Sequence, residues 1–227
     1  MILKKTFKFR LRPNRAQESL CNQFAGARRW VYNRALSKKK EAYEKDKKNI
    51  SLFDFNCELT VLKKQEETAW LKDIHSQVLQ QSLHDLDLAY ENFFRRVKSG
   101  NEAPGYPKFK CKGEDDSFRY SQGVKVKDHF VWLPKIGWTR FKKSREIKGK
   151  IKQTTVIKEA KKWYICFSCE CDQREIVVDP QTLVGIDLGI EFFATATSSY
   201  GEWSEDNPRF LNSCLSHQPK LNYDRFI

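Results

Sequence analysis

The spacing of the apolar residues changes near residue 104, and this change limits the chain to a mixed fold. Before that point, apolar side chains recur three and four positions apart, at Leu79, Leu83, Leu86, Tyr90, Phe93 and Val97. This spacing predicts the core-facing stripe of a helix that begins near Ile74 or His75 and ends at Gly100. After a turn at residues 104–107, six β-prone runs follow: 118–122, 124–127, 130–133, 138–141, 150–158 and 162–171. Short strands at such intervals are typical of a small barrel or sandwich, so we expect an α+β fold.

A further strand is expected before the helices. Residues 2–12 alternate between two kinds of side chain, apolar at Leu3, Phe7, Phe9 and Leu11, and cationic at Lys4, Lys8, Arg10 and Arg12. The alternation predicts a half-buried strand with a cationic outer face. Such a face either protects the edge of a sheet from pairing or contacts phosphates. We favour phosphate contact because the surrounding chain is basic.

The helices are therefore expected to interrupt a β-domain. Asn14 and Gln17 have the spacing of a capping box, which predicts a helix that reaches about Lys48. A second helix is expected from Asp54 to Glu66. We expect a small antiparallel β-barrel built from residues 1–13 and 104–176, with a helical bundle, residues 14–103, inserted between its first two strands.

The charge points to a polyanionic partner. The formal net charge is +13; residues 184–227 hold six acids and three bases, so residues 1–183 carry +16. A basic body with many aromatic residues is typical of nucleic-acid-binding proteins. No apolar run approaches the roughly 20 residues of a membrane span, and the N-terminus has no signal-peptide pattern. We expect a cytoplasmic nucleic-acid-binding protein that does not bind membranes.

Seven aromatic residues are interleaved with the bases of the β-prone half: Phe109, Phe118, Tyr120, Trp132, Trp138, Phe141 and Trp163. Exposed aromatics beside cations form platforms for stacking bases. The alternative is that these rings fill the interior of the barrel, which must hold for some of them.

The cysteines do not indicate a zinc site. The chain has seven, an odd number, and they are scattered. The one cluster lies on an expected strand, where alternation places Cys166 on one face and Cys169 and Cys171 on the other. A structural zinc ion needs four converging ligands, so no zinc is expected.

One carboxylate lies inside a short apolar run near the C-terminus. Val184–Ile190 reads V-G-I-D-L-G-I and is followed by a second β-prone run, Phe193 to Ser198, that ends at Tyr200-Gly201. The pattern predicts a buried strand, a tight turn and a pairing strand. Asp187 would then be either a hydrogen-bonded turn residue or a metal ligand.

Several motifs, in order along the chain, resemble the TnpB/OrfB family of insertion-sequence proteins, relatives of the type V CRISPR effectors. The motifs are K-x-F-x-x-R-L-x-P-N-x-x-Q from Lys5, W-V-Y-N-R-A-L from Trp30, L-x-x-A-Y-x-N-F-F-R-R from Leu86, G-Y-P-K-F-K from Gly105, V-G-I-D-L-G-I from Val184 and N-P-R-F-L from Asn207. The resemblance covers nearly the whole chain up to about Leu211.

The resemblance implies an RNA-guided DNA endonuclease scaffold. In the family a wedge-type barrel grips a guide RNA, and the barrel and the inserted helical recognition domain read a short motif in double-stranded DNA. A nuclease domain of the RNase H/RuvC type then cuts DNA with Mg²⁺ held by three carboxylates. Asp187 matches the first of these and is the expected catalytic residue and magnesium ligand.

Thirteen residues are expected to contact nucleic acid. They are Lys4, Lys8, Arg10, Arg12, Gln80, Tyr106, Lys108, Lys110, Arg119, Gln122, Lys142, Lys143 and Lys150. Gln80 and Gln122 lie in segments that match the family's DNA-reading segments, and glutamine is able to read base edges.

The chain departs from the family after Asp187. The second and third carboxylate motifs and the paired CxxC zinc element do not follow it, so residues 180–227 match only the truncated start of the nuclease domain. We expect an incomplete catalytic site, no productive magnesium binding and no cleavage by the chain alone. The alternatives are a cleavage-free RNA-guided repressor, the remnant of a frameshifted gene, a nuclease completed by another chain, or an unrelated basic RNA-binding protein. The resemblance also implies a prokaryotic protein and a separate partner enzyme for transposition itself. The oligomeric state is left open.

Overall fold

The computed structural model describes residues 2–100, 103–114, 116–172 and 183–208. It divides into two compact units, Met1–Arg174 and Glu175–Ile227, each described here by itself. The expected boundary between residues 176 and 180 lies outside the described residues.

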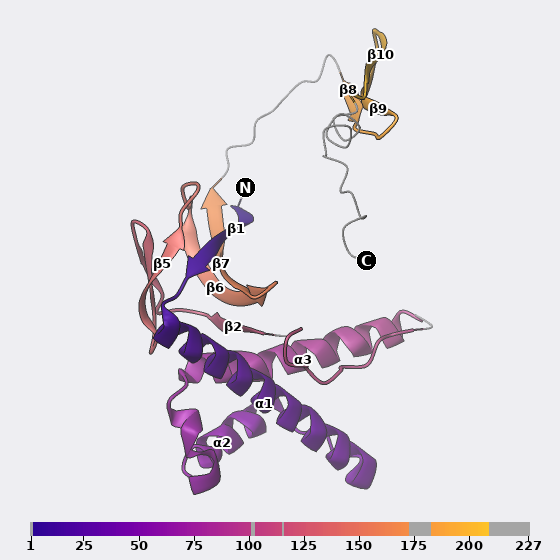
Figure 1. The fold of residues 1–227 in the computed structure, drawn as a ribbon. Helices are drawn as coiled ribbons and strands as arrows, with labels where there is room; N and C mark the ends of the chain where they lie inside the picture. Colours follow the sequence, from indigo (N-terminus) through magenta and orange to yellow (C-terminus); the bar gives the residue numbers. More distant parts are fainter. Residues whose placement is uncertain (1, 101–102, 115, 173–182, 209–227) are drawn as a thin grey trace, which may run out of the picture. The chain divides into compact units, whose positions relative to one another are not determined.

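The first unit contains a curled antiparallel sheet of seven strands, ordered β2-β6-β7-β1-β5-β4-β3 (Figure 1). The strands are β1 (Ile2–Arg12), β2 (Ser117–Tyr120), β3 (Lys125–Lys127), β4 (Phe130–Leu133), β5 (Gly137–Lys142), β6 (Lys150–Glu159) and β7 (Lys162–Asp172). All seven expected strands are present. The barrel is only half closed, however, because β2 and β3 end the sheet without pairing with each other in the described part of the chain.

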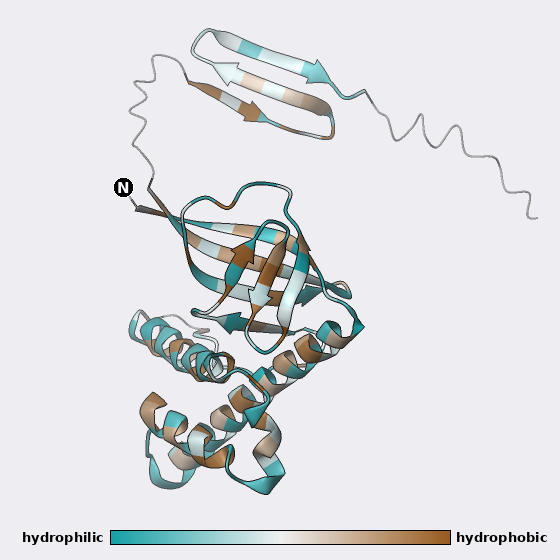
Figure 2. Ribbon diagram, turned by 90° about the vertical axis from the view of Figure 1, so that its left-hand side faces the viewer, coloured by the Kyte–Doolittle hydropathy of each residue, from teal (hydrophilic) through white to brown (hydrophobic). Residues whose placement is uncertain are grey.

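Strand β1 lies inside the sheet. Its residues Ile2 to Arg10 pair with β7, and Arg10 to Arg12 pair with β5. The predicted alternation is confirmed, since Phe9 and Leu11 are 2 % exposed and the four cationic residues predicted for the outer face, Lys4, Lys8, Arg10 and Arg12, are exposed. Figure 2 shows the same alternation of hydrophobic and hydrophilic residues along the strands.

Between β1 and β2 the chain forms α1 (Arg15–Asp46), α2 (Leu52–Leu62), a 3₁₀ helix η1 (Glu66–Lys72) and α3 (Ser76–Lys98). The capping box of α1 is confirmed. The backbone N–H of Gln17 donates to Asn14 Oδ1 at 2.8 Å, and the backbone N–H of Asn14 donates to Gln17 Oε1 at 3.1 Å. The expected bounds of the second helix were wrong. Ser51 and Asp54 form a capping box of their own, so α2 begins two residues earlier, and the segment around Glu66 belongs to η1.

The helices and the inner face of the sheet share one hydrophobic core. Phe24 of α1 packs on Phe118 and Tyr120 of β2, with ring centroids 5.3 and 6.5 Å apart. In Figure 1, β2 lies beside the helices, at the edge of the sheet. The core stripe predicted for α3 is confirmed from Leu79 to Tyr90. It was wrong at its end, because Phe93 is only half-buried and Val97 is 46 % exposed.

The second unit is a three-stranded antiparallel meander of β8 (Val184–Asp187), β9 (Phe192–Ser198) and β10 (Gly201–Asp206), in the order β10-β9-β8. The first two strands and the turn between them are as predicted, whereas β10 was not predicted. The expected burial of β8 was wrong, because all four of its residues are exposed. Three strands cannot cover both of their own faces. Ala194 is the one buried hydrophobic residue among residues 183–208.

Within the described segments, no helix has the length and apolar character needed to cross a bilayer.

Candidate nucleic-acid interface

The outer face of the sheet brings cations from neighbouring strands directly opposite one another. Arg10 of β1 is paired with Lys142 of β5, and Arg12 with Arg140. All four side chains are exposed, and none forms an ion pair with a carboxylate in the part of the chain that the structure describes. Like charges directly opposite in a sheet are destabilising. An anion bound between the two strands would relieve this repulsion.

Exposed aromatic rings adjoin these cations. Trp132 of β4 is paired with Trp138 of β5, and their ring centroids are 5.7 Å apart. Phe130 is paired with Arg140 in the same hairpin. The three rings are 37–47 % exposed, although aromatic side chains are usually buried.

Two lysines of β3 complete this surface. Lys125 and Lys127 are the register partners of Trp132 and Phe130, and both are exposed. We call the whole surface the basic aromatic face: Arg10, Arg12, Lys125, Lys127, Phe130, Trp132, Trp138, Arg140 and Lys142.

The structure separates the seven interleaved aromatics into the two expected classes. Four fill the core, at 2 % exposure or less: Phe118, Tyr120, Phe141 and Trp163. Three are exposed: Phe109, Trp132 and Trp138. The sequence alone missed Lys125, Lys127, Phe130 and Arg140 as candidates, because they join the site only through the pairing of β3, β4 and β5.

The other end of the outer face is largely neutralised. Lys8 donates to Glu159 at 2.6 Å and lies 4.9 Å from the ring of Tyr164; the hydrogen bond with Glu159 raises the pKa of Lys8. Lys4 and Lys150 are both register partners of Glu170. The Glu170 carboxylate accepts from Lys152 at 2.9 Å, and this hydrogen bond lowers its pKa. Lys4, Lys8 and Lys150 therefore face carboxylates, unlike Arg10 and Arg12.

Arg119 of β2 joins the sheet to the helices. It forms an ion pair with Asp85 of α3, which also accepts from Arg28 of α1 at 3.0 Å. Arg28 in turn donates to Ser117 Oγ at 2.8 Å. With both oxygens of Asp85 engaged by arginines, the charge of Arg119 is already compensated in the free protein.

The loop before β2 carries three more candidates. Tyr106 and Lys108 are exposed, and the backbone of Lys110 exchanges two hydrogen bonds with the side chain of Asn33, at 2.8 and 3.0 Å. The Tyr106 and Tyr90 hydroxyls are 2.6 Å apart. These contacts fix the loop against α1 and α3.

Three further candidates lie apart from these groups. Gln80 is exposed on α3, Gln122 is exposed in the turn after β2, and Lys143 is partly buried just after β5. Their contacts with nucleic acid stay predictions.

Asp187 is exposed at the end of β8, paired in register with Thr195 of β9. In the described ranges, no group of three His, Cys, Asp or Glu side chains could hold a metal ion. Residues 209–227, including Asp224, lie outside those ranges. The described residues thus do not bring together the three carboxylates of the family's magnesium site, and the catalytic role of Asp187 stays a prediction.

The cysteine cluster divides as the alternation predicted. Cys166 is partly exposed on the outer face, while Cys169 and Cys171 are 1 and 8 % exposed on the inner face. The Cys171 thiol donates to the Lys148 carbonyl oxygen at 3.0 Å.

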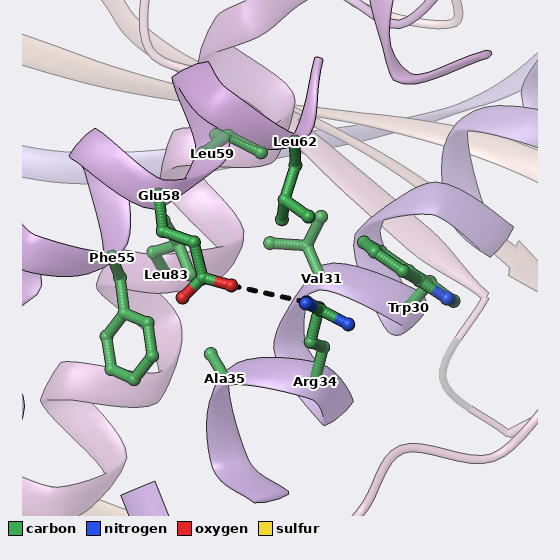
Figure 3. A pocket seen from close by; sticks show the side chains of 9 residues that line it. All are labelled: Trp30, Val31, Arg34, Ala35, Phe55, Glu58, Leu59, Leu62 and Leu83. Carbon is green, nitrogen blue, oxygen red and sulfur yellow. Dashed lines mark hydrogen bonds and ion pairs between the residues drawn. The ribbon is translucent and has the colours of Figure 1, made fainter. Parts of the chain in front are cut away.

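A pocket between α1, α2 and α3 is too small for a ligand (Figure 3). Its volume is about 10 Å³, and a single water needs about 10–15 Å³. Glu58 accepts from Arg34 at 3.3 Å and from Lys38 at 2.5 Å at its rim. The remaining walls are mainly apolar, so this pocket belongs to helix packing: Trp30, Val31, Ala35, Phe55, Leu59, Leu62 and Leu83.

The chain is similar to a family model and to two curated proteins. A family model described as a helix-turn-helix domain, HTH_OrfB_IS605, matches residues 1–48. The structure has one strand and one long helix there, so the matched segment is not itself a helix-turn-helix.

Two curated relatives match most of the chain. InsQ of Escherichia coli (strain K12), whose name proposes an RNA-guided DNA endonuclease, is 42 % identical over 191 residues, which are 83 % of this chain and 46 % of InsQ. A Streptomyces pristinaespiralis protein, whose name proposes the same activity, is 29 % identical over 86 % of this chain and 48 % of its own length. The chain thus spans about half the length of these relatives.

The chain is also similar to one chain of a solved structure, the Cas12f1–sgRNA–target DNA complex. The match covers 94 % of this chain and 59 % of the matched chain, at 15 % sequence identity and a TM-score of 0.40.

Proposed function

The chain belongs to the TnpB/OrfB family, and from this membership we propose that it binds RNA on its basic aromatic face as part of an RNA-guided DNA-recognition protein. The observation that carries the proposal is the pairing of Arg12 with Arg140 beside the exposed pair Trp132 and Trp138. Phosphates would lie between the opposed guanidinium groups, and unpaired bases would stack on the indole rings.

Double-stranded DNA is the proposed second partner. Gln80 on α3 and Gln122 after β2 are both exposed, and each has the amide group that can read an adenine edge in the major groove. We propose that residues 14–103, together with the turn that carries Gln122, act as the DNA-recognition part, while the rest of the β-domain proposed for residues 1–13 and 104–176 holds the RNA.

For catalysis we propose a limited role. Asp187 would be the first carboxylate of a RuvC-type nuclease site, and these 227 residues would not cleave DNA by themselves. A nuclease of this class needs several carboxylates around paired cations about 4 Å apart. The described residues bring no such group together.

The test is RNA capture. The chain is expressed beside its native flanking DNA and purified, and the RNA that accompanies it is sequenced. We expect one defined RNA with the unmodified chain and strong depletion of that RNA with the double variant Trp138→Ala and Arg140→Gln. The variant Tyr200→Ala, which removes an 84 % exposed ring from the second unit, should capture RNA normally. Random RNA with the unmodified chain, or full capture by the double variant, would refute the proposal.

Cleavage is tested separately. Purified protein with its captured RNA and Mg²⁺ should leave a matching DNA duplex intact. Magnesium-dependent nicking that disappears in Asp187→Ala would show that the chain is an active nuclease.

A further inference from the structure

A second aromatic and cationic site lies on the helical part, where the later turns of α1 and α3 leave a pocket between them. Its volume is about 390 Å³, near the low end of the roughly 300–1,000 Å³ typical of small-ligand sites. We call it the helix-fork pocket and define it by its lining residues: Lys39, Tyr43, Lys47, Lys48, Asn49, Tyr90, Phe93, Phe94 and Tyr106.

The pocket exists because both helices continue past the shared core. The buried residues of α1 end at Leu36, and those of α3 end at Tyr90. Beyond these points the facing side chains are still aromatic but not covered: Tyr43 is 60 % exposed and Phe94 is 53 % exposed. An apolar surface that the core does not use is more informative about binding than single exposed residues.

The aromatic walls are held in place by one another. Phe93 packs edge-on against Phe94 and Tyr106, with ring centroids 5.2 Å apart in both pairs. Tyr90 stacks on Phe94 at 6.2 Å, and its hydroxyl meets that of Tyr106 at 2.6 Å. The walls are therefore ordered before any ligand arrives, which lowers the entropic cost of binding.

The charges around the pocket are positive. Its lining includes three lysines and no carboxylate. The Lys39 side chain is 11 % exposed, its ammonium lies 4.6 Å from the centre of the Tyr90 ring, and its ion-pair partner Asp87 is 3.9 Å away. Burial lowers the pKa of Lys39, and Asp87 opposes that shift. Lys47 lies 4.9 Å from the ring of Tyr43.

We propose that the helix-fork pocket receives one unstacked base of a single-stranded nucleic acid, with the adjoining phosphates on Lys39, Lys47 and Lys48. Aromatic faces stack on any base, and a groove that combines such faces with cations is the usual design of a single-strand site. An acidic peptide would form ion pairs with the lysines, but it would place no planar group against the five aromatic side chains that line the pocket. The inference rests on the proposed function in that it assumes a nucleic-acid partner, and it adds a second contact point on the helices.

The test uses an eight-nucleotide uridine strand that carries one 2-aminopurine, a base whose fluorescence falls when it stacks. We expect quenching on binding to the unmodified chain. The double variant Tyr43→Ala and Phe94→Ala should abolish this quenching and weaken binding by at least about 5-fold, the lower end of the effect of removing a stacking ring. Lys39→Gln should weaken binding while retaining quenching in the bound state.

A matched control is Phe53→Ala, which removes a 74 % exposed ring on α2 that does not line the pocket. It should leave affinity and quenching unchanged. Circular dichroism of each variant checks that the helices are intact.

The outcomes separate this inference from the proposed function. Loss of RNA capture in Trp138→Ala with Arg140→Gln, together with unchanged 2-aminopurine quenching in Tyr43→Ala with Phe94→Ala, would overturn the pocket and leave the sheet site standing. The reverse result would support the pocket and refute the sheet site. Pocket-dependent binding of a fluorescent oligoglutamate peptide, without binding of the uridine strand, would also overturn the inference.

Discussion

Arg12 of β1 and Arg140 of β5 are register partners in the middle of the sheet, and both are exposed. Like charges on directly opposed residues of a sheet repel each other, so the free protein carries a local cost that an anion would remove. The pairing thus connects the stability of the sheet to the occupancy of its outer face.

The first prediction concerns this pair. Arg140→Gln should raise the free energy of unfolding of the RNA-free protein by about 0.2–1 kcal/mol, because it removes one of two opposed charges. The same change should weaken RNA binding and reduce the dependence of log affinity on log salt by about 0.7–0.9, the value of one phosphate contact. Urea unfolding and salt titrations measure the two effects. Lys64→Gln, an exposed change after α2, serves as the control and should alter neither quantity.

The indole rings give a second prediction. Trp138→Ala should weaken RNA binding by about 1–3 kcal/mol if a base stacks on this ring. The fold should survive, because Trp138 is 45 % exposed and lies on the outer face. Filter binding with the captured RNA measures the affinity. An affinity equal to that of the Tyr200→Ala control would exclude Trp138 from the interface.

The third prediction concerns pH. Burial, aided by the charges of Lys135 and Lys63, lowers the pKa of His75 below 6.5 in the folded chain. Between that lowered value and 6.5 the unfolded chain binds more protons, so stability falls as the pH drops through this window. Replacement by His75→Gln should flatten the decline between pH 7 and 5.5. Urea unfolding at several pH values measures it, and His84→Gln, at an exposed site on α3, should retain the slope of the unmodified chain.

A fourth prediction separates steric clash from backbone strain. Gly149 has φ +87°, and a Cβ there would lie 2.2 Å from the Glu170 carbonyl oxygen and 2.7 Å from Cys171 Sγ. Gly113 has a similar φ of +92° but nothing within 4 Å of its Cβ position. Both alanine variants should lower the free energy of unfolding by more than about 1 kcal/mol, because a residue with a side chain is strained at either backbone conformation. Gly149→Ala should lower it clearly more than Gly113→Ala, and urea unfolding measures both. Equal decreases would mean that β7 moves away from the added Cβ at little cost.

Local patterns predicted the elements well. Alternation located β1, six β-prone runs located the other strands of the seven-stranded sheet, and the Asn14–Gln17 capping box gave the start of α1. The same rule applied to Ser51 and Asp54 would have corrected the start of α2. These signals depend on neighbours in sequence, which is why they can be read without a structure.

The candidate site was less predictable, because it depends on strand pairing. Arg12 and Arg140 are far apart in sequence, and no local pattern specifies that β1 lies between β5 and β7. The sequence therefore predicted the cations of β1 but not their partners. It also could not show that Lys8 is matched by Glu159, or that the core stripe of α3 stops at Tyr90.

The central place of β1 has a consequence for synthesis on the ribosome. The first strand to emerge needs β5 along one edge and β7 along the other. One edge therefore waits until Gly137–Lys142 has been made, and the other until Lys162–Asp172 has been made. Non-local pairing of this kind slows folding, and unpaired strand edges are prone to aggregate. The charged outer residues of β1 would disfavour pairing of this nascent strand with strands of other chains until β5 and β7 have been synthesised.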